Sequence, residues 1–498
     1  MTPPESKEAI ESALSLNPQF STLPKPDVVA PEDLTQNTPT GEIFRLQEVQ
    51  DTITGDFIVL PCDLVCELDG ISLLEEWMVQ EAGLGGATGG ISNGKATPAG
   101  VGGERMGRRG GLGVWYSTKR GEDTIKGEET DFIATTPLPA PIVPPPQASL
   151  RRDISKLVYA IPTDTMKDLT EGGQNFLIRH SLLKKHGRIK MYTAYRDAHI
   201  YFFPYWVKEM MQRNEMLDSV GEDVIGWWAK AGWQDGLGDK LGLNEILEPT
   251  EAADLHHASG NEYPIDPEVD VASYSTTHTA LYGDDRTDTI PPTGPSILVS
   301  RDPSSPASPS VALPQKTIAK VPPILAYVQP SSTSAPLVRR VDSAALLLNV
   351  SLRLAKLPSL HDAENKEKIS PFAHALKVAH PDSIPRQCRV EAENSLLAEN
   401  VTVGERCNIK ESVIGANCTI GEGSRLFKCL LMEGAVVGEY TQMSGCILGR
   451  RCKIEGGSKL DKEKTELKDC EVQEGYVVPW GSKSILFFLP PYPLAFGS

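Results

Sequence analysis

Two aspartates, Asp63 and Asp197, combine a residue type and a position in the sequence that could support chemistry. Asp63 follows the apolar run 57–60, a pattern that predicts a strand buried on both faces, as in a parallel sheet. Asp197 opens the largely apolar run 197–203. Because α/β sheets bind ligands at the carboxyl ends of their strands, Asp63 would face such a site. Carboxylates are also suitable ligands for Mg²⁺.

A metal-dependent transfer site also needs groups that position the phosphates. The glycine-rich stretch 83–113 is a candidate phosphate loop, but no strand leads directly into it and it contains no Gly-Lys-Ser/Thr triplet. Its composition is typical of a flexible insertion. We therefore expect no bound cofactor, metal or catalytic residue, and we interpret Asp63 and Asp197 as vestigial candidates that cap strand ends.

A regular spacing of aliphatic residues is the strongest pattern in the sequence. They recur at steps of six, six and five residues, so the pattern closes every seventeen residues. A fixed short period is the signature of a solenoid, and one aliphatic residue per hexad fits no amphipathic helix. The sequence therefore predicts a parallel β-helix with three faces per coil, whose core positions are Leu397, Val403, Ile409, Ile414, Ile420, Leu426, Leu431, Val437, Met443, Leu448, Ile454 and Leu460.

Glycine follows the aliphatic residue in several hexads, and we expect it to turn the corner with a positive φ; these glycines are Gly404, Gly415, Gly421, Gly438 and Gly449. Small residues four positions after an aliphatic, such as Cys407, Cys418 and Cys452, are expected to fill inward slots as buried hydrophobes. Acyl transfer on a β-helix uses a histidine base on the coil. The last histidine here, His380, precedes the first coil, so this activity is disfavoured.

Composition narrows the class of protein further. The chain has 498 residues and a net charge of −17, which argues against a nucleic-acid surface. Nine cysteines without a CxxC pair argue against zinc and fit a reduced, cytosolic protein. The opening residues are polar, which indicates no signal peptide, and no apolar run reaches the length of about 20 residues that a membrane helix needs.

The order of the segments predicts two folded domains separated by linkers. Strand–helix alternation over 42–235 favours an α/β domain at 1–250, interrupted by the insertion 83–113. The Pro/Ser/Thr-rich segment 251–320 cannot bury a core and is expected to be disordered. Residues 321–385 complete the α/β domain and add a linker helix, 386–480 form the β-helix, and 481–498 form an atypical apolar tail.

The combination of an α/β domain, a linker helix and a hexad β-helix resembles sugar-nucleotide pyrophosphorylases. Three motifs make the resemblance more specific. The segments 57–64 (FIVLPCDL), 197–201 (DAHIY) and 408–418 (NIKESVIGANC) are together similar to the gamma subunit of eukaryotic translation initiation factor 2B, in a fungal form with long insertions. The resemblance implies a nucleotidyltransferase-like (Rossmann-like) α/β domain and a left-handed β-helix of hexapeptide repeats.

The resemblance also implies a function. Such subunits belong to the guanine-nucleotide exchange factor for initiation factor 2. They dock this substrate and pair with the catalytic epsilon subunit and the other subunits, with no transferase activity of their own. Asp63 matches the metal-holding aspartate of active pyrophosphorylases, and Asp197 falls in the region that supplies their second carboxylate. A Mg²⁺-dependent sugar-1-phosphate nucleotidyltransferase is therefore the alternative.

Two departures from the family pattern are visible. The opening strand and its glycine-rich loop, which hold the nucleotide triphosphate in active pyrophosphorylases, are absent upstream of Glu8, so we expect an N-terminally incomplete domain. The segment 485–491 replaces the polar tail of the family, which suggests a misjoined exon.

Overall fold

In the computed structural model, the apolar run Ile324–Val328 forms strand β7, which is buried along its whole length inside a six-stranded sheet. β7 is parallel to β3 and antiparallel to β5. The strand order is β1-β6-β3-β7-β5-β4, and β4 also pairs with β6, so that the sheet curls back toward itself. The other strands are β1 (Phe57–Val59), β3 (Gly111–Ser117), β4 (Asp131–Thr136), β5 (Ile154–Pro162) and β6 (Lys190–Phe203).

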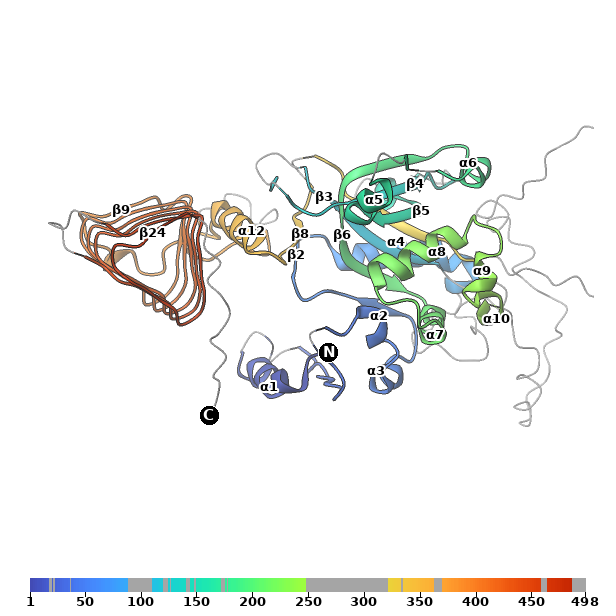
Figure 1. Cartoon of the computed structure of the whole chain (residues 1–498), viewed down its shortest axis with the longest axis horizontal. Coiled ribbons are helices and arrows are strands. Elements are labelled where there is room, and N and C mark those ends of the chain that lie inside the picture. The colour runs from blue at the N-terminus through green and yellow to red at the C-terminus, as the bar shows by residue number, and fades with distance from the viewer. Residues whose placement is uncertain are drawn as a thin grey trace, which may run out of the picture. The chain divides into compact units, whose positions relative to one another are not determined.

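The structure describes the chain except for residues 18–19, 21–22, 36, 88–109, 120–123, 126, 140–143, 147–148, 172–174, 177, 248–320, 333–334, 362–369, 458–463 and 486–498. The chain divides into two compact units (Figure 1). Unit 1 comprises Met1–Leu60, Asp69–Trp115 and Glu129–Pro330. Unit 2 comprises Pro61–Leu68, Tyr116–Glu128 and Ser331–Ser498. The insertion expected at 251–320 lies outside the described residues.

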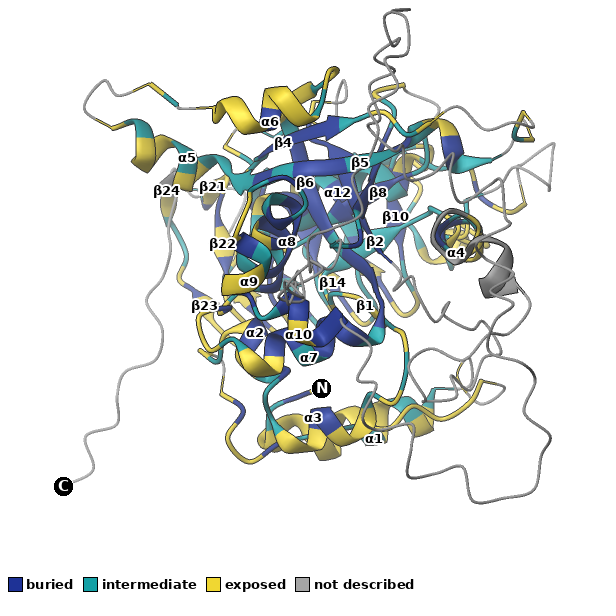
Figure 2. Cartoon of the chain, turned by 90° about the vertical axis from the view of Figure 1, so that its right-hand side faces the viewer, coloured by how far each residue is buried: buried dark blue, intermediate teal, exposed yellow. Residues whose placement is uncertain are grey.

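Helices cover both faces of the unit 1 sheet. Neighbouring residues of a strand point to opposite faces. Phe202 contacts Trp77 of α4 with ring centroids 5.8 Å apart, whereas Phe203 contacts Trp228 of α8 at 6.2 Å. Figure 2 shows the buried strands between helices whose outer sides are exposed. The helices of unit 1 are α1 (Lys7–Leu16), α2 (Thr40–Ile43), α3 (Gln47–Thr52), α4 (Gly70–Ala87), α5 (Thr163–Thr170), α6 (His180–Lys185), α7 (Tyr205–Arg213), α8 (Ile225–Ala231), α9 (Leu237–Lys240) and α10 (Leu243–Leu247), with the short 3-10 helices η1 (Pro4–Ser6) and η4 (Leu150–Asp153) and the π-helix η5 (Val220–Val224).

The strand predicted at 57–60 exists, but the prediction that both of its faces are buried is wrong. β1 lies at the edge of the sheet and is antiparallel to β6. Ile58 is 47% exposed and Leu60 is 63% exposed. An apolar run alone does not distinguish a central strand from an edge strand whose second side is left uncovered.

The glycine-rich stretch 83–113 is only partly accounted for by an insertion. Residues 83–87 belong to α4, residues 88–109 lie outside the described part of the chain, and Gly111 and Gly113 lie in the buried strand β3. A Cβ atom on Gly111 would lie 2.5 Å from the ring of Trp228, and one on Gly113 would lie 2.8 Å from the ring of Trp115. Glycine is therefore required there for aromatic packing.

The hexad repeats of unit 2 form a parallel β-helix with three sheets. The sheet orders are β10-β13-β16-β19-β22, β11-β14-β17-β20-β23 and β24-β21-β18-β15-β12-β9. Equivalent residues of successive coils lie side by side, as in the register Leu397, Ile414, Leu431 and Leu448. The strands are β9 (Arg389–Val390), β10 (Leu396–Leu397), β11 (Thr402–Val403), β12 (Asn408–Lys410), β13 (Val413–Ile414), β14 (Thr419–Ile420), β15 (Arg425–Phe427), β16 (Leu430–Leu431), β17 (Val436–Val437), β18 (Gln442–Ser444), β19 (Ile447–Leu448), β20 (Lys453–Ile454), β21 (Glu466–Lys468), β22 (Glu471–Val472), β23 (Val477–Val478) and β24 (Lys483–Ile485).

The core positions from Leu397 to Ile454 point into the β-helix, and each is at most 5% exposed. Leu460 requires a correction. It lies outside the described residues, and the place beside Met443 that a strict seventeen-residue period would give it is occupied by Leu467. The coil between β20 and β21 is longer than the others, so the core resumes later with Leu467, Val472 and Val478.

The glycines after the aliphatic residues do not turn the corners with a positive φ, which corrects that expectation. Positive φ values occur two or three residues after the aliphatic, for example at Asn400, Glu411 and Gly423. The glycines instead permit close approach between coils. A Cβ on Gly421 would lie 2.5 Å from the backbone nitrogen of Glu439 in the next coil.

One face of the β-helix is apolar on its outer side as well. Leu396, Leu430 and Ile447 point outward from the β10-β13-β16-β19-β22 sheet, yet all three are buried. Helix α12 (Ala344–Lys356) packs against β13 and β16 and covers this face. Ser343 caps the start of α12 by accepting a hydrogen bond from the backbone nitrogen of Leu346.

The β-helix extends beyond its expected limits of 386–480. Val378 already bridges to Leu397, and β24 reaches Ile485. The rest of the expected tail, 486–498, lies outside the described residues. Unit 2 also contains the short turn η8 (Pro381–Ser383) and an antiparallel pair formed by β2 (Leu64–Cys66) and β8 (Val338–Arg340). None of the helices that the structure describes is long and apolar enough to cross a membrane.

Candidate functional site

Asp197 lies in β6 with His199 and Tyr201 on the same face, because side chains alternate along a strand. It is 7% exposed. The hydroxyl of Tyr201 donates to Oδ2 of Asp197 at 2.5 Å, and the backbone nitrogen of His199 donates to Oδ1 at 2.8 Å. His199 has a φ of +53°, in the left-handed region. The carboxylate of Asp197 thus stabilises a local kink of its own strand.

Acidic groups surround this part of β6. The backbone nitrogen of Asp197 donates to Oδ2 of Asp131 at 2.6 Å. Arg196 forms an ion pair with Glu129 at 3.3 Å, which offsets part of the negative charge. Burial, reinforced by Asp223 and Glu129, raises the pKa of Glu222. The cluster is therefore acidic and internally hydrogen-bonded.

Asp63 has a different surrounding. The guanidinium of Arg340 contacts Oδ2 of Asp63 through Nε at 3.2 Å and Nη2 at 3.0 Å. The backbone oxygen of Asp63 accepts a hydrogen bond from the backbone nitrogen of Val341 at 2.7 Å. Asp342 also lies 3.7 Å from Arg340. Asp63 therefore joins the start of β2 to the end of β8.

The structure does not define Asp63 and Asp197 as parts of one site. Asp63 belongs to unit 2 and Asp197 to unit 1, and each has protein partners of its own. Within the residues that the structure describes, no group of three or more His, Cys, Asp or Glu side chains is arranged to hold a metal ion. The assignment of the two aspartates as relics stays a prediction.

The cysteines of the β-helix fill inward slots. Cys407, Cys418 and Cys452 are each at most 1% exposed. Burial raises the pKa of the Cys407 thiol to about 11 and that of Cys452 to about 12. Thiols that stay protonated are poor nucleophiles and poor metal ligands. These side chains act as small packing groups.

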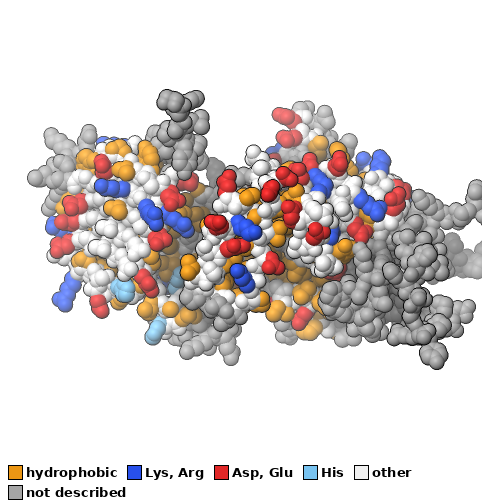
Figure 3. All heavy atoms as spheres, turned by 90° about the horizontal axis from the view of Figure 1, so that it is seen from below, with side chains coloured by type: hydrophobic (Ala, Val, Ile, Leu, Met, Phe, Trp, Pro, Cys, Tyr) orange, Lys and Arg blue, Asp and Glu red, His pale blue; other side chains and the backbone are white. Residues whose placement is uncertain are grey.

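Charged corner residues of the β-helix contact other parts of unit 2. Arg406 lies 2.7 Å from Glu422. Glu411 lies 3.7 Å from Lys356 of α12 and 3.9 Å from Lys428. Phe427, on the outer side of β15, is 41% exposed, and the ammonium group of Lys428 lies 5.2 Å from the centroid of its ring. Figure 3 shows one surface of the molecule, where acidic, basic and apolar side chains are mixed.

Sequence analysis missed the partners of both aspartates. Arg340 is 277 residues away from Asp63, and no local pattern connects them. The contact of Asp197 with Tyr201 had a signal, because residues at i and i+4 of a strand share a face.

The fold defines a protein with an α/β sheet unit and a parallel β-helix of hexapeptide repeats. Comparison with known proteins relates this β-helix to a known domain family. The family model described as "EIF2B subunit epsilon LbH domain" matches residues 378–478, the same coils that the structure shows from Val378 to Val478.

A relative supports the same assignment. The "Translation initiation factor eIF2B subunit gamma" of Schizosaccharomyces pombe (strain 972) is 31% identical over 93 residues. The match covers 19% of this chain and 19% of that protein, so the chain matches about a fifth of the length of its curated relative. The chain is therefore similar to eIF2B subunits over its β-helix domain and over about a fifth of the length of the gamma subunit.

Proposed function

We propose that this chain is a non-catalytic subunit of a translation initiation factor 2B complex in the cytosol, of the gamma type. In this role it pairs with the catalytic epsilon subunit and docks initiation factor 2, and it supports GDP–GTP exchange without performing it. The observation that carries the proposal is the match of residues 378–478, most of the β-helix, to an eIF2B domain.

The name of the curated relative and the sequence motifs favour gamma over epsilon. The motif at 197–201 forms the kinked part of β6, and the motif at 408–418 forms one complete stretch of coil through β12 and β13. The mixed sheet with helices on both faces is compatible with a nucleotidyltransferase-like unit that has a scaffolding role.

The partners of Asp63 and Asp197 support a non-catalytic role. A metal-dependent transferase needs carboxylate oxygens available to the ion and groups that position the phosphates. The Asp63 carboxylate is paired with Arg340, and both oxygens of Asp197 accept hydrogen bonds from β6. Use of these carboxylates by Mg²⁺ would require these interactions to be replaced.

Co-expression with an epsilon subunit tests the proposal. We expect a tagged full-length chain to co-purify with epsilon, to release negligible GDP from initiation factor 2 alone, and to increase the release that epsilon produces. Ile420→Asp places a charge inside the β-helix and should abolish pairing, whereas Thr419→Asp, on the exposed side of the same strand, is the matched control.

Failure of the intact chain to associate with epsilon or with other subunits would contradict the scaffold function. Release of pyrophosphate from a nucleoside triphosphate and a sugar 1-phosphate in the presence of Mg²⁺ would favour the alternative transferase. That activity should then be lost in Asp63→Asn and Asp197→Asn, while subunit pairing is kept.

A further inference from the structure

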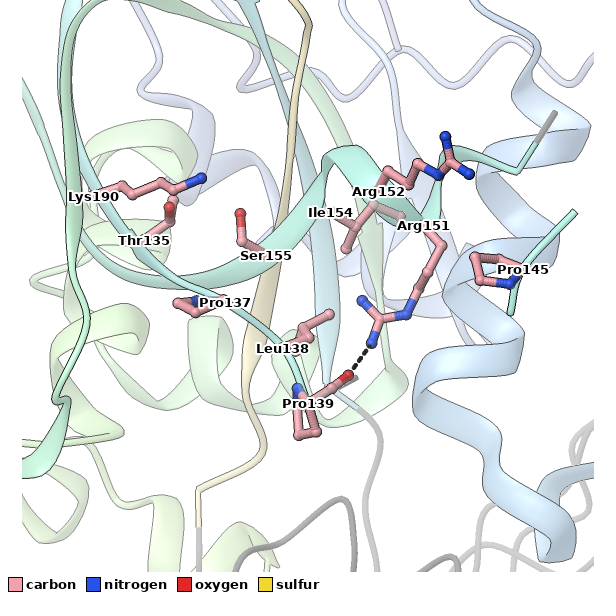
Figure 4. A pocket seen from close by; sticks show the side chains of 10 residues that line it. All are labelled: Thr135, Pro137, Leu138, Pro139, Pro145, Arg151, Arg152, Ile154, Ser155 and Lys190. Carbon is pink, nitrogen blue, oxygen red and sulfur yellow. Dashed lines mark hydrogen bonds between the residues drawn. The ribbon is translucent and has the colours of Figure 1, made fainter. Parts of the chain in front are cut away.

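A cavity of about 290 Å³ lies at one end of strands β4, β5 and β6 in unit 1 (Figure 4). Its wall includes Thr135 of β4, Ser155 of β5 and Lys190 of β6. Two arginines of the turn η4, Arg151 and Arg152, complete the polar lining. The cavity is therefore formed by consecutive strand ends and by the turn that precedes β5.

The charged side chains that line this cavity are all basic. Arg151 is only 9% exposed, and its Nη2 donates to the backbone oxygen of Pro139 at 2.9 Å. Among the described residues, no carboxylate lies within 4.0 Å of the cationic groups of Arg151, Arg152 or Lys190. The chain has a net charge of −17, yet the wall of this cavity holds three cations and no carboxylate; Asp153, which interacts electrostatically with Arg152, lies outside the lining.

The nearest acidic influence on Arg151 comes from outside the lining. Glu76 of α4 accepts a hydrogen bond from the hydroxyl of Ser149, and its charge partly offsets the effect of burial on Arg151. Burial is the larger effect and lowers the pKa of the Arg151 guanidinium. An anion in the cavity would reduce the cost of holding this cation away from water.

The shape of the wall also suits a small polar ligand. Thr135 and Ser155 contribute hydroxyl-bearing side chains to the lining; Thr135 is 1% exposed and Ser155 is half-buried. In Figure 4, Lys190 and Arg151 lie on opposite sides of the cavity with Ser155 between them. Prolines at 137, 139 and 145 restrict the backbone of the remaining wall, because their φ angles are fixed.

We propose that this cavity binds the phosphate group of a small phosphorylated molecule. Phosphate carries more charge than a carboxylate and matches both the planar fork of an arginine and hydroxyl donors. The volume lies at the lower end of the range for ligand pockets, about 300–1,000 Å³, so a small phosphomonoester fits better than a nucleotide.

This site is separate from the acidic cluster near Asp197. In the pairing of β4 with β6, Asp131 lies opposite Tyr195, whereas Thr135 lies opposite Lys190 at the other end of β4. The acidic end of the strand pair disfavours anions and the basic end attracts them. Binding at the basic end therefore does not depend on the role of Asp197.

Titration calorimetry on the full chain tests the proposal, with inorganic phosphate and glycerol phosphate as ligands at constant ionic strength. Lys190→Gln removes an exposed cation of the cavity and should weaken phosphate binding about fivefold. Lys184→Gln removes an exposed cation of α6 that does not line the cavity, and it should leave the affinity unchanged. Arg151→Lys keeps the charge but loses the fork, so it should also weaken binding.

The two ligands distinguish the sources of the phosphate group. Tighter binding of glycerol phosphate supports a phosphorylated small molecule, whereas binding of inorganic phosphate alone would overturn that part of the proposal. Absence of saturable binding to the intact chain, or equal weakening by Lys190→Gln and Lys184→Gln, would overturn the site itself. Thermal melting of each variant identifies any loss of folding, and Lys190→Gln tests the site without touching the buried arginine.

Discussion

The guanidinium Nη2 of Arg340 lies 3.0 Å from the carboxylate Oδ2 of Asp63. The ion pair connects the residue before β2 to the last residue of β8, and β2 and β8 are paired antiparallel immediately beside it. Both side chains are largely buried, with 17% and 19% of their surfaces exposed. The Asp63 carboxylate thus stabilises a pair of strands in unit 2.

Asp63→Asn should destabilise unit 2 by about 1 kcal/mol, because the neutral amide leaves Arg340 with a weaker partner in a partly buried place. Hydrogen exchange measured on peptides that cover β2 and β8 would report the loss. Glu471→Gln, which removes an exposed carboxylate from β22, is the control and should change little. Equal protection in both variants would show that the ion pair contributes no stability.

Ile420→Ala should lower the free energy of unfolding of the β-helix by about 3 kcal/mol. Ile420 is 1% exposed and packs inside the coil, so truncation removes buried surface and leaves a cavity. Chemical denaturation followed by hydrogen exchange of the coil peptides measures the change. Thr419→Ala alters the exposed neighbour on the same strand, and a similar loss there would contradict the inward assignment.

Leu430→Asp should destabilise the β-helix by at least about 3 kcal/mol, although Leu430 points outward from β16. It is 7% exposed under the face that α12 covers, so a charge there would be desolvated. Val436→Asp is the matched control on a different face, where the side chain is only half-buried, and it should cost much less. Similar effects of the two substitutions would argue against the inference that α12 covers this face of the β-helix.

The stability of the β-helix should fall as the pH rises above about 9. The ordinary thiol pKa is 9.0, and burial raises it to about 11 for Cys407 and about 12 for Cys452. Between pH 9 and 11 the unfolded chain therefore loses thiol protons that the folded chain keeps, and this favours unfolding. The urea midpoint for unfolding of the β-helix in the intact chain, followed by hydrogen exchange and measured at pH 8, 9 and 10, gives the slope of stability against pH.

Cys452→Ala provides the control for this pH dependence. The variant starts from a lower stability because alanine leaves a small cavity, but its decline above pH 9 should be shallower since one titrating thiol is gone. An unchanged slope would assign the alkaline loss to other groups.

The sequence by itself determined the β-helix. The aliphatic residues from Leu397 to Ile454 repeat at the spacing of a coil, and each inward position is fixed by neighbours in the chain, so the pattern is local and readable. The apolar run of β7 (Ile324–Val328) and the helical periodicity of α12 (Ala344–Lys356) are also local signals that can be read from the sequence.

The tertiary structure alone decided which groups these elements meet. Leu467 takes the place beside Met443 because a longer coil intervenes, and α12 turns the outward Leu430 into a buried residue. Asp63 pairs with Arg340, which lies 277 positions away in the sequence. These relationships depend on contacts between distant segments, and the residue spacing within any one segment holds no information about them.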